Sequence, residues 1–188
     1  MLNLSIQPLE PGSPLLARIA ADQFAHWGQL TGHSSRRAYE AFLEDAARSS
    51  SLPRVLTASL QGTLLGSVNL LANEMTIRPR FTPWMGQLFV APDNRARGVG
   101  AALLASAASY VGELGYRQLF LFTSGTLPDY YRSKGWTDVD AGAVLPNCLG
   151  ETARLWWSVK KRTLGEIPEN GEGATGQDCE RGSWRNDH

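Results

Sequence analysis

Apolar residues in the first fifty positions of the chain recur with the period of an α-helix. Ser13 and Pro14 suit the first positions of a helix, and the apolar face that follows runs to about residue 28. A second periodic stretch begins at Ser34 or Ser35, either of which can cap a helix. The pattern therefore predicts two consecutive helices that each bury one face.

The middle of the chain changes from helical spacing to strand patterns. Residues 54–60 alternate between apolar and polar positions, Gln61-Gly62 has the composition of a hairpin turn, and residues 64–72 form a second strand pattern. Residues 85–90 and 119–122 are almost wholly apolar, which is typical of strands that are covered on both faces. These two segments are predicted to lie in the centre of a sheet.

A long apolar helix is predicted over residues 98–114, and Gly115 suits the position just after its end. The remaining predicted elements are a loop over residues 73–83, a short helix over 127–133, and closing strands over 136–139 and 153–159. This order of helices and strands predicts a single α/β domain.

The composition suits a globular protein of one domain, with 188 residues and a mass of 20.5 kDa. Its two cysteines, Cys148 and Cys179, are too few for a disulfide framework and lack the close pairing of a zinc site. No stretch approaches roughly 18 apolar residues, and residues 1–10 lack the basic and apolar regions of a secretory signal. We therefore expect a cytoplasmic protein with no membrane span and no bound metal.

The formal net charge of zero is the sum of two unlike parts. Residues 163–188 hold six acids and two bases, whereas residues 1–162 hold 12 acids and 16 bases. The C-terminal part is also poor in large apolar side chains, so we expect a disordered acidic tail on a domain formed by residues 1–162. Bases in the domain are scattered and not interleaved with aromatic residues, which argues against nucleic-acid binding.

The segment that points most clearly to chemistry follows the apolar strand that ends at Val90. A turn at Pro92-Asp93-Asn94 is followed by Arg95-Ala96-Arg97-Gly98-Val99-Gly100, which leads directly into the long helix. The first turn of a helix offers unpaired N–H groups, and glycines let a phosphate approach the backbone. The segment therefore predicts an anion site, although the glycines alone are equally consistent with a tight turn. A P-loop would need Gly-Lys-Ser/Thr, and a dinucleotide fingerprint would need a small residue where Leu103 stands.

Three motifs in this region resemble one enzyme family. Arg95-x-x-Gly98-x-Gly100 resembles the Gln/Arg-x-x-Gly-x-Gly/Ala signature of the GCN5-related N-acetyltransferases, the GNAT superfamily. The preceding Val90-x-Pro92 is similar to that family, and Tyr131-x-x-x-Gly135-Trp136 matches its Tyr-x-x-x-Gly-aromatic element. One helix and one strand separate the motifs, as in the family. The resemblance covers roughly residues 3–160 in the order of elements and is motif-specific over about 84–136.

This resemblance implies an acetyl-coenzyme A-dependent N-acetyltransferase with a mixed, largely antiparallel sheet, a central splay of parallel strands and flanking helices. The coenzyme would lie in the splay, with its pyrophosphate on backbone amides of residues 97–102. Main-chain groups of residues 88–90 would hold the pantetheine, and an N–H near Phe89 or Val90 would polarise the acetyl carbonyl. The residues that the resemblance implies for coenzyme binding are Leu88, Phe89, Val90, Arg95, Ala96, Arg97, Gly98, Val99, Gly100, Ala101 and Tyr131.

Tyr131 matches the tyrosine that protonates the departing thiolate in many members of the family. A phenol with a reference pKa of about 10 is a plausible proton donor to a developing thiolate. Tyr130 takes this role if the register of the short helix shifts by one residue. Packing alone is the other explanation for either tyrosine.

A general base is harder to assign, because residues 84–90 contain no Asp or Glu at the place where some members carry one. Glu74, at the exit of the preceding strand, is the nearest carboxylate and is the predicted catalytic base. His26 and His33, in the connection between the first two helices, are alternatives, and a water chain without a dedicated base is another. An ordinary solvated charge is the competing explanation for Glu74.

The predicted acceptor is a primary amine of a small molecule or peptide, attacked directly in a ternary complex. The pocket for it is expected near Phe24, His26, Trp27, residues 74–84 and the loop of residues 141–150. Arg78 and Arg80 either meet a carboxylate of the acceptor or are solvated. The alternative function is a non-catalytic acyl-coenzyme A-binding sensor or interaction module. A homodimer is also considered, through Trp156, Trp157 or an exposed strand edge.

Overall fold

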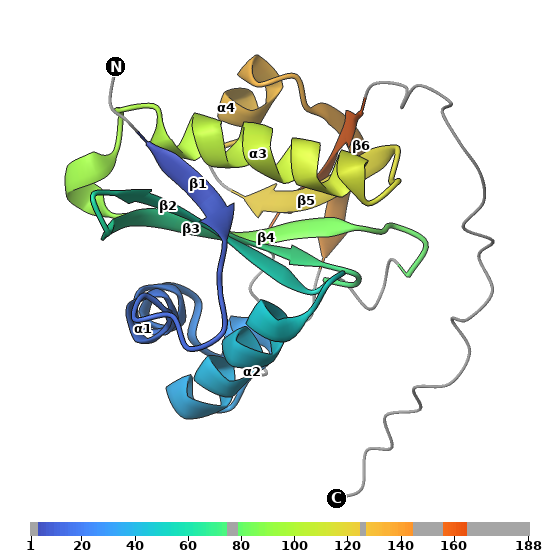
Figure 1. Cartoon of the computed structure of the whole chain (residues 1–188). Coiled ribbons are helices and arrows are strands. Elements are labelled where there is room, and N and C mark those ends of the chain that lie inside the picture. The colour runs from blue at the N-terminus through green and yellow to red at the C-terminus, as the bar shows by residue number, and fades with distance from the viewer. Residues whose placement is uncertain (1–3, 75–78, 125–126, 145–155, 165–188) are drawn as a thin grey trace, which may run out of the picture.

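The computed structural model describes residues 4–74, 79–124, 127–144 and 156–164 (Figure 1). Within these residues the strands are β1 (Ser5–Pro8), β2 (Arg54–Leu60), β3 (Thr63–Leu71), β4 (Trp84–Val90), β5 (Gln118–Ser124), β6 (Thr137–Val144) and β7 (Trp156–Thr163). The α-helices are α1 (Leu16–Trp27), α2 (Arg36–Arg48), α3 (Val99–Glu113) and α4 (Pro128–Ser133), with 3₁₀ turns η1 (Gly28–Thr31) and η2 (Pro92–Asn94).

The strands form one mixed sheet in the order β1-β2-β3-β4-β5-β7-β6. Neighbouring strands pair antiparallel except β4 and β5, which are parallel. Within the described residues, β4 and β5 are paired at one position, Trp84 opposite Phe120. Because Trp84 is the first residue of β4, the two strands separate toward their carboxyl ends. The predicted α/β fold, with a largely antiparallel sheet and a central parallel splay, is confirmed.

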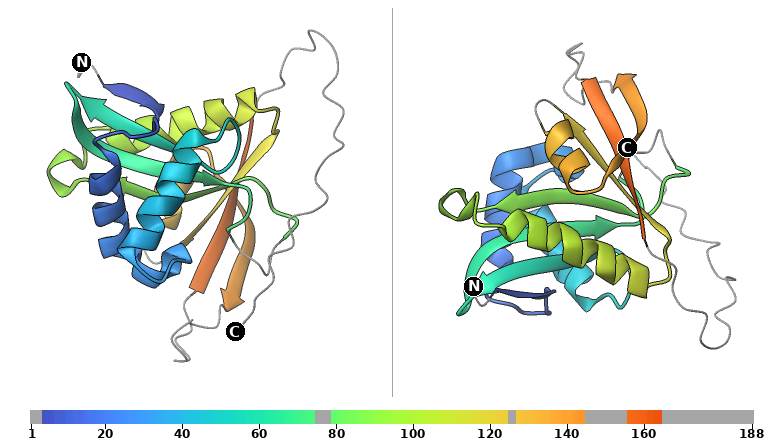
Figure 2. Two further views of the ribbon diagram at one scale, coloured as in Figure 1. Left: turned by 60° about the horizontal axis from the view of Figure 1, so that its bottom comes forward. Right: turned by 90° about the horizontal axis from the view of Figure 1, so that it is seen from above.

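Helices cover both faces of the sheet. Helices α1 and α2 lie on one face, and α3 and α4 lie on the other, as the views in Figures 1 and 2 show. Two apolar clusters correspond to these two layers. The larger cluster packs α3 against strands β2 to β5 and includes Val68, Leu70, Met85, Leu103, Val111 and Leu119. The smaller cluster packs α1 and α2 against β2 and includes Leu9, Ile19, Tyr39, Leu43 and Val55.

The predicted elements occur, with differences at their ends. Helix α2 has the predicted cap, since the Ser35 Oγ accepts a hydrogen bond from Ala38 N at 3.2 Å. Helix α1 begins at Leu16 rather than at residue 13, because the Ser13 hydroxyl and carbonyl close a turn onto Leu15 N and Leu16 N. Strand β1 was not predicted, because its four residues, Ser5–Pro8, are too short for a periodic signal.

The last described residues belong to the fold. Strand β7 ends at Thr163, and Leu164 packs against the α3 cluster while its N–H donates to Arg117 O at 3.0 Å. The acidic tail predicted over residues 163–188 lies outside the described residues from residue 165 onward, as does Cys148. None of the helices described here is long and apolar enough to cross a membrane. The same residues hold no cluster of three or more His, Cys, Asp or Glu side chains suited to a metal ion.

Candidate functional site

Three aromatic side chains fix the point where β4 and β5 separate. Phe81 stacks on Phe120 with ring centroids 4.8 Å apart, and Trp84 packs against Phe120 at 5.9 Å. Trp84 is fully buried, and its indole N–H donates to the carbonyl of Phe81. Beyond this group the backbone of β4 runs alongside β3, and residues 88–90 lie at the diverging end of the strand with partly buried side chains.

The connection from β4 to α3 has the shape of an anion cradle. Residues 95–98 are exposed, and Ala96 and Gly98 have φ angles of +58° and +85°. A side chain at Gly98 would be strained by this φ, although no atom lies within 4 Å of its Cβ position. The first intrahelical bond joins Ala102 N to Gly98 O at 3.0 Å, so the amides of residues 98–101 precede the bonded part of the helix. These amides and the exposed arginines suit a diphosphate.

The predicted coenzyme residues are thus gathered at one end of β4 and the start of α3. Arg95 Nε donates to Val90 O at 3.1 Å, which ties the connection back to the strand. Val99 is buried and anchors the first turn of α3 in the core, while Arg97 is exposed. At Gly100 a Cβ would lie 3.3 Å from the Tyr130 hydroxyl, so the missing side chain allows α4 to approach the helix start closely.

Glu74 lies over the middle of β4, although it follows β3 in the chain. Its carboxylate oxygens are 2.8 and 3.0 Å from the Cβ position that Gly86 lacks. Gln87 Nε2 donates to Glu74 Oε1 at 3.0 Å. Burial raises the pKa of Glu74 to about 7, and the hydrogen bond from Gln87 opposes this rise. A carboxylate with such a pKa can accept and release a proton near neutral pH.

Gln87 lies at an irregularity in β4 that shapes this part of the site. Its φ is +45°, and the pairing of β3 with β4 shifts register between Ser67 and Asn69. The bulged backbone directs the Gln87 side chain toward Asn69, whose Nδ2 donates to Gln87 Oε1 at 3.1 Å. Bulges often re-aim side chains beside functional sites.

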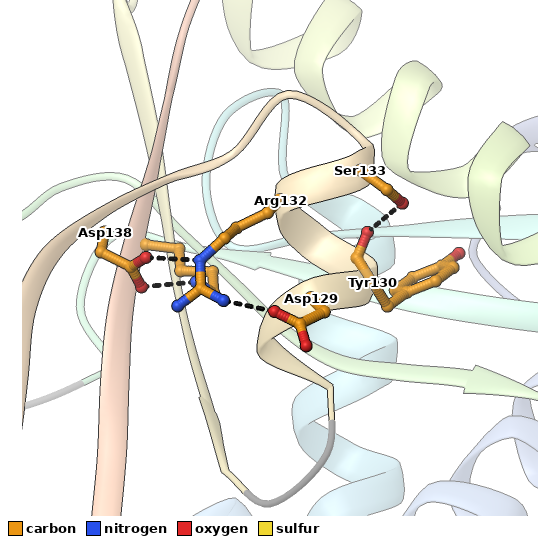
Figure 3. A network of polar contacts seen from close by, with 6 residues as sticks. Asp129, Tyr130, Arg132, Ser133 and Asp138 are labelled. Carbon is orange, nitrogen blue, oxygen red and sulfur yellow. Dashed lines mark hydrogen bonds and ion pairs between the residues drawn. The ribbon is translucent and has the colours of Figure 1, made fainter.

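The two tyrosines of α4 occupy different environments. Tyr131 is buried, packs edge-on against Trp136 at 6.2 Å, and has its pKa raised to about 12 by burial. Tyr130 is exposed, and its hydroxyl lies beside Gly100 at the start of α3. Figure 3 shows the Tyr130 ring on the opposite side of α4 from Arg132, whose Nε donates to Asp138 at 2.8 Å. The structure therefore places the Tyr130 hydroxyl beside the start of α3, whereas the Tyr131 ring lies in the core cluster behind it.

The end of α1 contributes an aromatic group beside β4. His26 is exposed, with its ring 4.6 Å from Trp27 and 6.1 Å from Phe89. His33 lies further away, with its Nδ1 2.8 Å from Thr31 O and its ring 5.2 Å from Tyr39. His26 therefore belongs to the last turn of α1 rather than to the connection between the helices, and it lies against Phe89 of β4, whereas His33 packs beside the Tyr39 ring.

Other residues predicted at the acceptor pocket have other surroundings. Phe24 packs against Tyr39 at 6.2 Å, and Arg80 lies over the Phe81 ring at 5.2 Å. Residues 141–144, predicted to lie in a loop, belong instead to strand β6, which continues the predicted closing strand. Arg78 falls outside the described residues, as do residues 145–150 of the predicted loop.

Sequence reasoning missed the polar side chains that are connected to Glu74 through Gln87. Gln23, Tyr39, Ser67, Asn69 and Gln87 form a connected hydrogen-bonded group under α1 and α2. The signal for them was present: Asn69 and Gln87 interrupt strands that are otherwise apolar, and buried polar residues require partners. Gly86 was missed too, although a strand glycine often marks a close approach.

Comparison with solved structures finds the same fold in acetyltransferases. An aminoglycoside 6'-N-acetyltransferase complexed with coenzyme A is 16% identical, has a TM-score of 0.65, and covers 88% of this chain and 99% of its own. A ribosomal-protein-alanine N-acetyltransferase from Brucella melitensis is 17% identical, with a TM-score of 0.64 and coverages of 85% and 99%. An N-acetyltransferase from Staphylococcus aureus Mu50 is 13% identical, with a TM-score of 0.65 and coverages of 87% and 99%.

A search of curated protein sequences returned no match. The sequence model of the Acetyltransferase (GNAT) family matches residues 17–134. This match spans α1 to α4, and so contains the β4–α3 connection and the tyrosines of α4. Since the match exceeds half of the chain and the fold is that of the neighbours above, the chain belongs to the acetyltransferase (GNAT) family.

Proposed function

We propose that the protein transfers the acetyl group of acetyl-coenzyme A to a primary amine of a small molecule or peptide by direct attack. In this reaction the amine nitrogen bonds to the thioester carbonyl carbon, and the carbon–sulfur bond breaks. Glu74 takes the proton that the amine nitrogen loses, directly or through a water molecule. Tyr131 supplies a proton to the coenzyme A thiolate. The products are the acetylated amine and the free thiol.

The position of the Glu74 carboxylate on β4 is the observation that carries this proposal. The strand itself has no acidic residue, which was the one feature that favoured a non-catalytic binding module. Glu74 supplies a carboxylate there from the segment after β3, against Gly86. With a pKa of about 7, it is ionised in a large share of molecules at neutral pH and remains basic enough to accept a proton.

The chain's own groups fit the coenzyme that the family uses. Amides of residues 98–101 and the exposed Arg97 would hold the diphosphate, and main-chain groups of residues 88–90 would hold the pantetheine arm. Acetyl-coenzyme A supplies the activated acyl group. Tyr131 remains a neutral phenol at physiological pH, because burial raises its pKa to about 12. Its proton is therefore available when a thiolate develops.

Two measurements in sequence test the proposal. Acetyl-coenzyme A should raise the Tm of the protein, and a panel of primary amines should include acceptors that release free thiol. An increase in Tm without thiol release on any amine would support the binding module instead. No increase in Tm with acetyl-coenzyme A would contradict both functions.

Tyr131→Phe is expected to lower kcat by about 10²-fold to 10⁴-fold, because the proton donor to the thiolate is removed. The Kd for acetyl-coenzyme A should change little, since the ring and its packing on Trp136 remain. Tyr130→Phe is the matched variant, because it removes a neighbouring hydroxyl that lies at Gly100. Stopped-flow turnover and calorimetric binding distinguish the two tyrosines. A loss of kcat in Tyr130→Phe alone would transfer the acid role to Tyr130.

Gly86→Ala is expected to lower kcat/KM by about 10-fold or more while the protein stays folded. The new Cβ would lie 2.8 Å from Glu74 Oε2, so the carboxylate must move away from β4. Gly112→Ala in α3 is a suitable control, because its Cβ would meet only Leu164 Cδ1 at 3.9 Å, an ordinary contact. Equal kcat/KM values for the two variants would show that the reaction does not depend on the position of the Glu74 carboxylate against Gly86.

A further inference from the structure

We infer that Gln87 is a positioning residue for Glu74, and that buried side chains from α1, α2 and β3 fix it with its amide N–H₂ toward the carboxylate. The inference rests on the proposed role of Glu74 as the base. It adds a set of residues that set the position and proton affinity of the base without touching the substrate.

The contacts form a continuous path from the helices to the carboxylate. On α1, Gln23 Nε2 lies 2.9 Å from the carbonyl oxygen of Gln87, and the Tyr39 hydroxyl of α2 donates to Gln23 Oε1 at 2.5 Å. On β3, Asn69 Nδ2 donates to the Tyr39 oxygen at 2.8 Å and to Gln87 Oε1 at 3.1 Å. Gln87 Nε2 then donates to Glu74 Oε1 at 3.0 Å.

One backbone carbonyl sets the direction of every bond on this path. The Gln87 carbonyl can only accept, so the Gln23 atom that faces it must be the N–H₂ group. The Gln23 oxygen is then left for Tyr39, which must donate its single proton there. The Tyr39 oxygen therefore accepts from Asn69.

The same reasoning continues to the carboxylate. Because the Asn69 amide donates, the Gln87 atom beside it is the oxygen. The Gln87 N–H₂ consequently faces Glu74, which accepts when it is ionised. The main chain of Gln87 thus fixes the orientation of its own side chain through three other residues. Reversing any one amide would set two donors or two acceptors against each other.

Burial makes this orientation costly to change. Gln23 and Asn69 have exposed fractions of 0%, and Tyr39 has 1%, so no solvent water competes for their hydrogen bonds. Asn69 Oδ1 and Ser67 Oγ lie 3.2 and 3.1 Å from Gln23 Nε2 and occupy its remaining donor capacity. A buried amide that lost a partner would be left unsatisfied, at a cost that favours the single connected arrangement.

Several titratable groups surround the path in the described part of the chain. Tyr39 faces it from α2, and burial, with a smaller contribution from the negative charge of Glu74, raises the Tyr39 pKa well above its ordinary value. The His33 ring lies 5.2 Å from the Tyr39 ring, and His26 lies on α1 against Phe89. Gln87, by contrast, donates directly to Glu74. This hydrogen bond stabilises the ionised carboxylate and lowers its pKa, whereas burial favours the protonated form and raises it.

The test is a pH titration of Glu74. It is monitored by NMR on protein labelled with ¹³C at the carboxyl carbons of glutamate. Glu74→Gln assigns the Glu74 signal. Tyr39→Phe removes one hydroxyl, keeps the ring, and releases Gln23, Asn69 and Gln87 from their fixed directions. We expect the Glu74 midpoint to rise by about 0.5–1 pH unit in Tyr39→Phe. Tyr116→Phe, outside the path, should leave the midpoint unchanged. An unchanged midpoint in folded Tyr39→Phe would overturn the inference.

A second variant acts at the carboxylate and tests the inference if Tyr39→Phe does not fold. Gln87→Met keeps the length of the side chain but cannot donate, so the Glu74 midpoint should rise at least as far. No rise in Gln87→Met would equally overturn the inference. These titrations need no substrate, so the absence of acetyl transfer to every amine would count against the proposed function alone. If the protein is active, the pH at which kcat/KM rises on the acidic side of its profile should shift in each variant by the same amount as the Glu74 midpoint measured by NMR.

Discussion

Glu74→Gln is expected to lower kcat/KM at pH 8 by about 10²-fold to 10⁴-fold, the range that a positioned general base contributes. The amide has nearly the shape of the carboxylic acid but cannot accept the proton of the amine. The pH profile is the sharper readout. Because the pKa of Glu74 is raised to about 7, wild-type kcat/KM should increase through pH 7 as the carboxylate ionises. The residual activity of Glu74→Gln should lack this step.

Stability measurements separate this effect from unfolding. Burial favours the protonated form, so between about pH 4.5 and 7 the folded state holds more protons at Glu74 than the unfolded state. The free energy of unfolding of the wild type should therefore decrease as pH rises through this window. Glu74→Gln should lack that decrease and be the more stable protein at pH 8, by at most about 3 kcal/mol. If Glu74→Gln shows the same pH dependence of kcat/KM as the wild type, including the increase through pH 7, Glu74 is not the base in the reaction.

Trp84→Ala is expected to destabilise the protein by about 3–5 kcal/mol, the cost of emptying a fully buried aromatic site. The lost indole supports Phe81 and Phe120 at the point where β4 and β5 separate. The variant should therefore also lose affinity for acetyl-coenzyme A, because the splay loses its fixed opening. Chemical denaturation gives the first quantity, and calorimetry below the unfolding transition gives the second.

Two further variants make this prediction specific. Trp84→Phe should recover much of the stability, since a ring remains against Phe120. Trp27→Ala on α1 removes the same side chain from a half-buried site and should cost less in unfolding free energy. If the two alanine variants are equally stable, Trp84 is not the anchor of the splay that its burial indicates.

The sequence was sufficient for features that depend on local pattern. Strand β2 has the predicted bounds Arg54–Leu60, and the apolar segment predicted to be central is β4, the fourth strand of the sheet. The turn at Gly98 that leads into α3 could be predicted from the sequence. Glycine is the residue that most readily adopts the left-handed conformation found there, and the position precedes a helix. The family assignment followed from such local motifs and is confirmed.

The surroundings of Glu74 could not be predicted, because they depend on contacts between distant segments. Gln23, Asn69 and Gln87 come from three elements, and their amides meet through the packing of α1 on the sheet and the bulge in β4. A one-residue change of register would send the Gln87 side chain to the other face of the sheet. The same limit applies to Gly86, whose role depends on the side chain of Glu74, a residue outside its own strand.

The position of β7 has a consequence for synthesis on the ribosome. The strand lies between β5 and β6, although it is the last of the three in the chain. While residues 156–163 are still inside the exit tunnel, β5 is an unprotected sheet edge and β6 has no partner to join. Newly made chains should therefore depend on chaperones until this final segment emerges, and arrest of translation before residue 156 should yield an aggregation-prone intermediate.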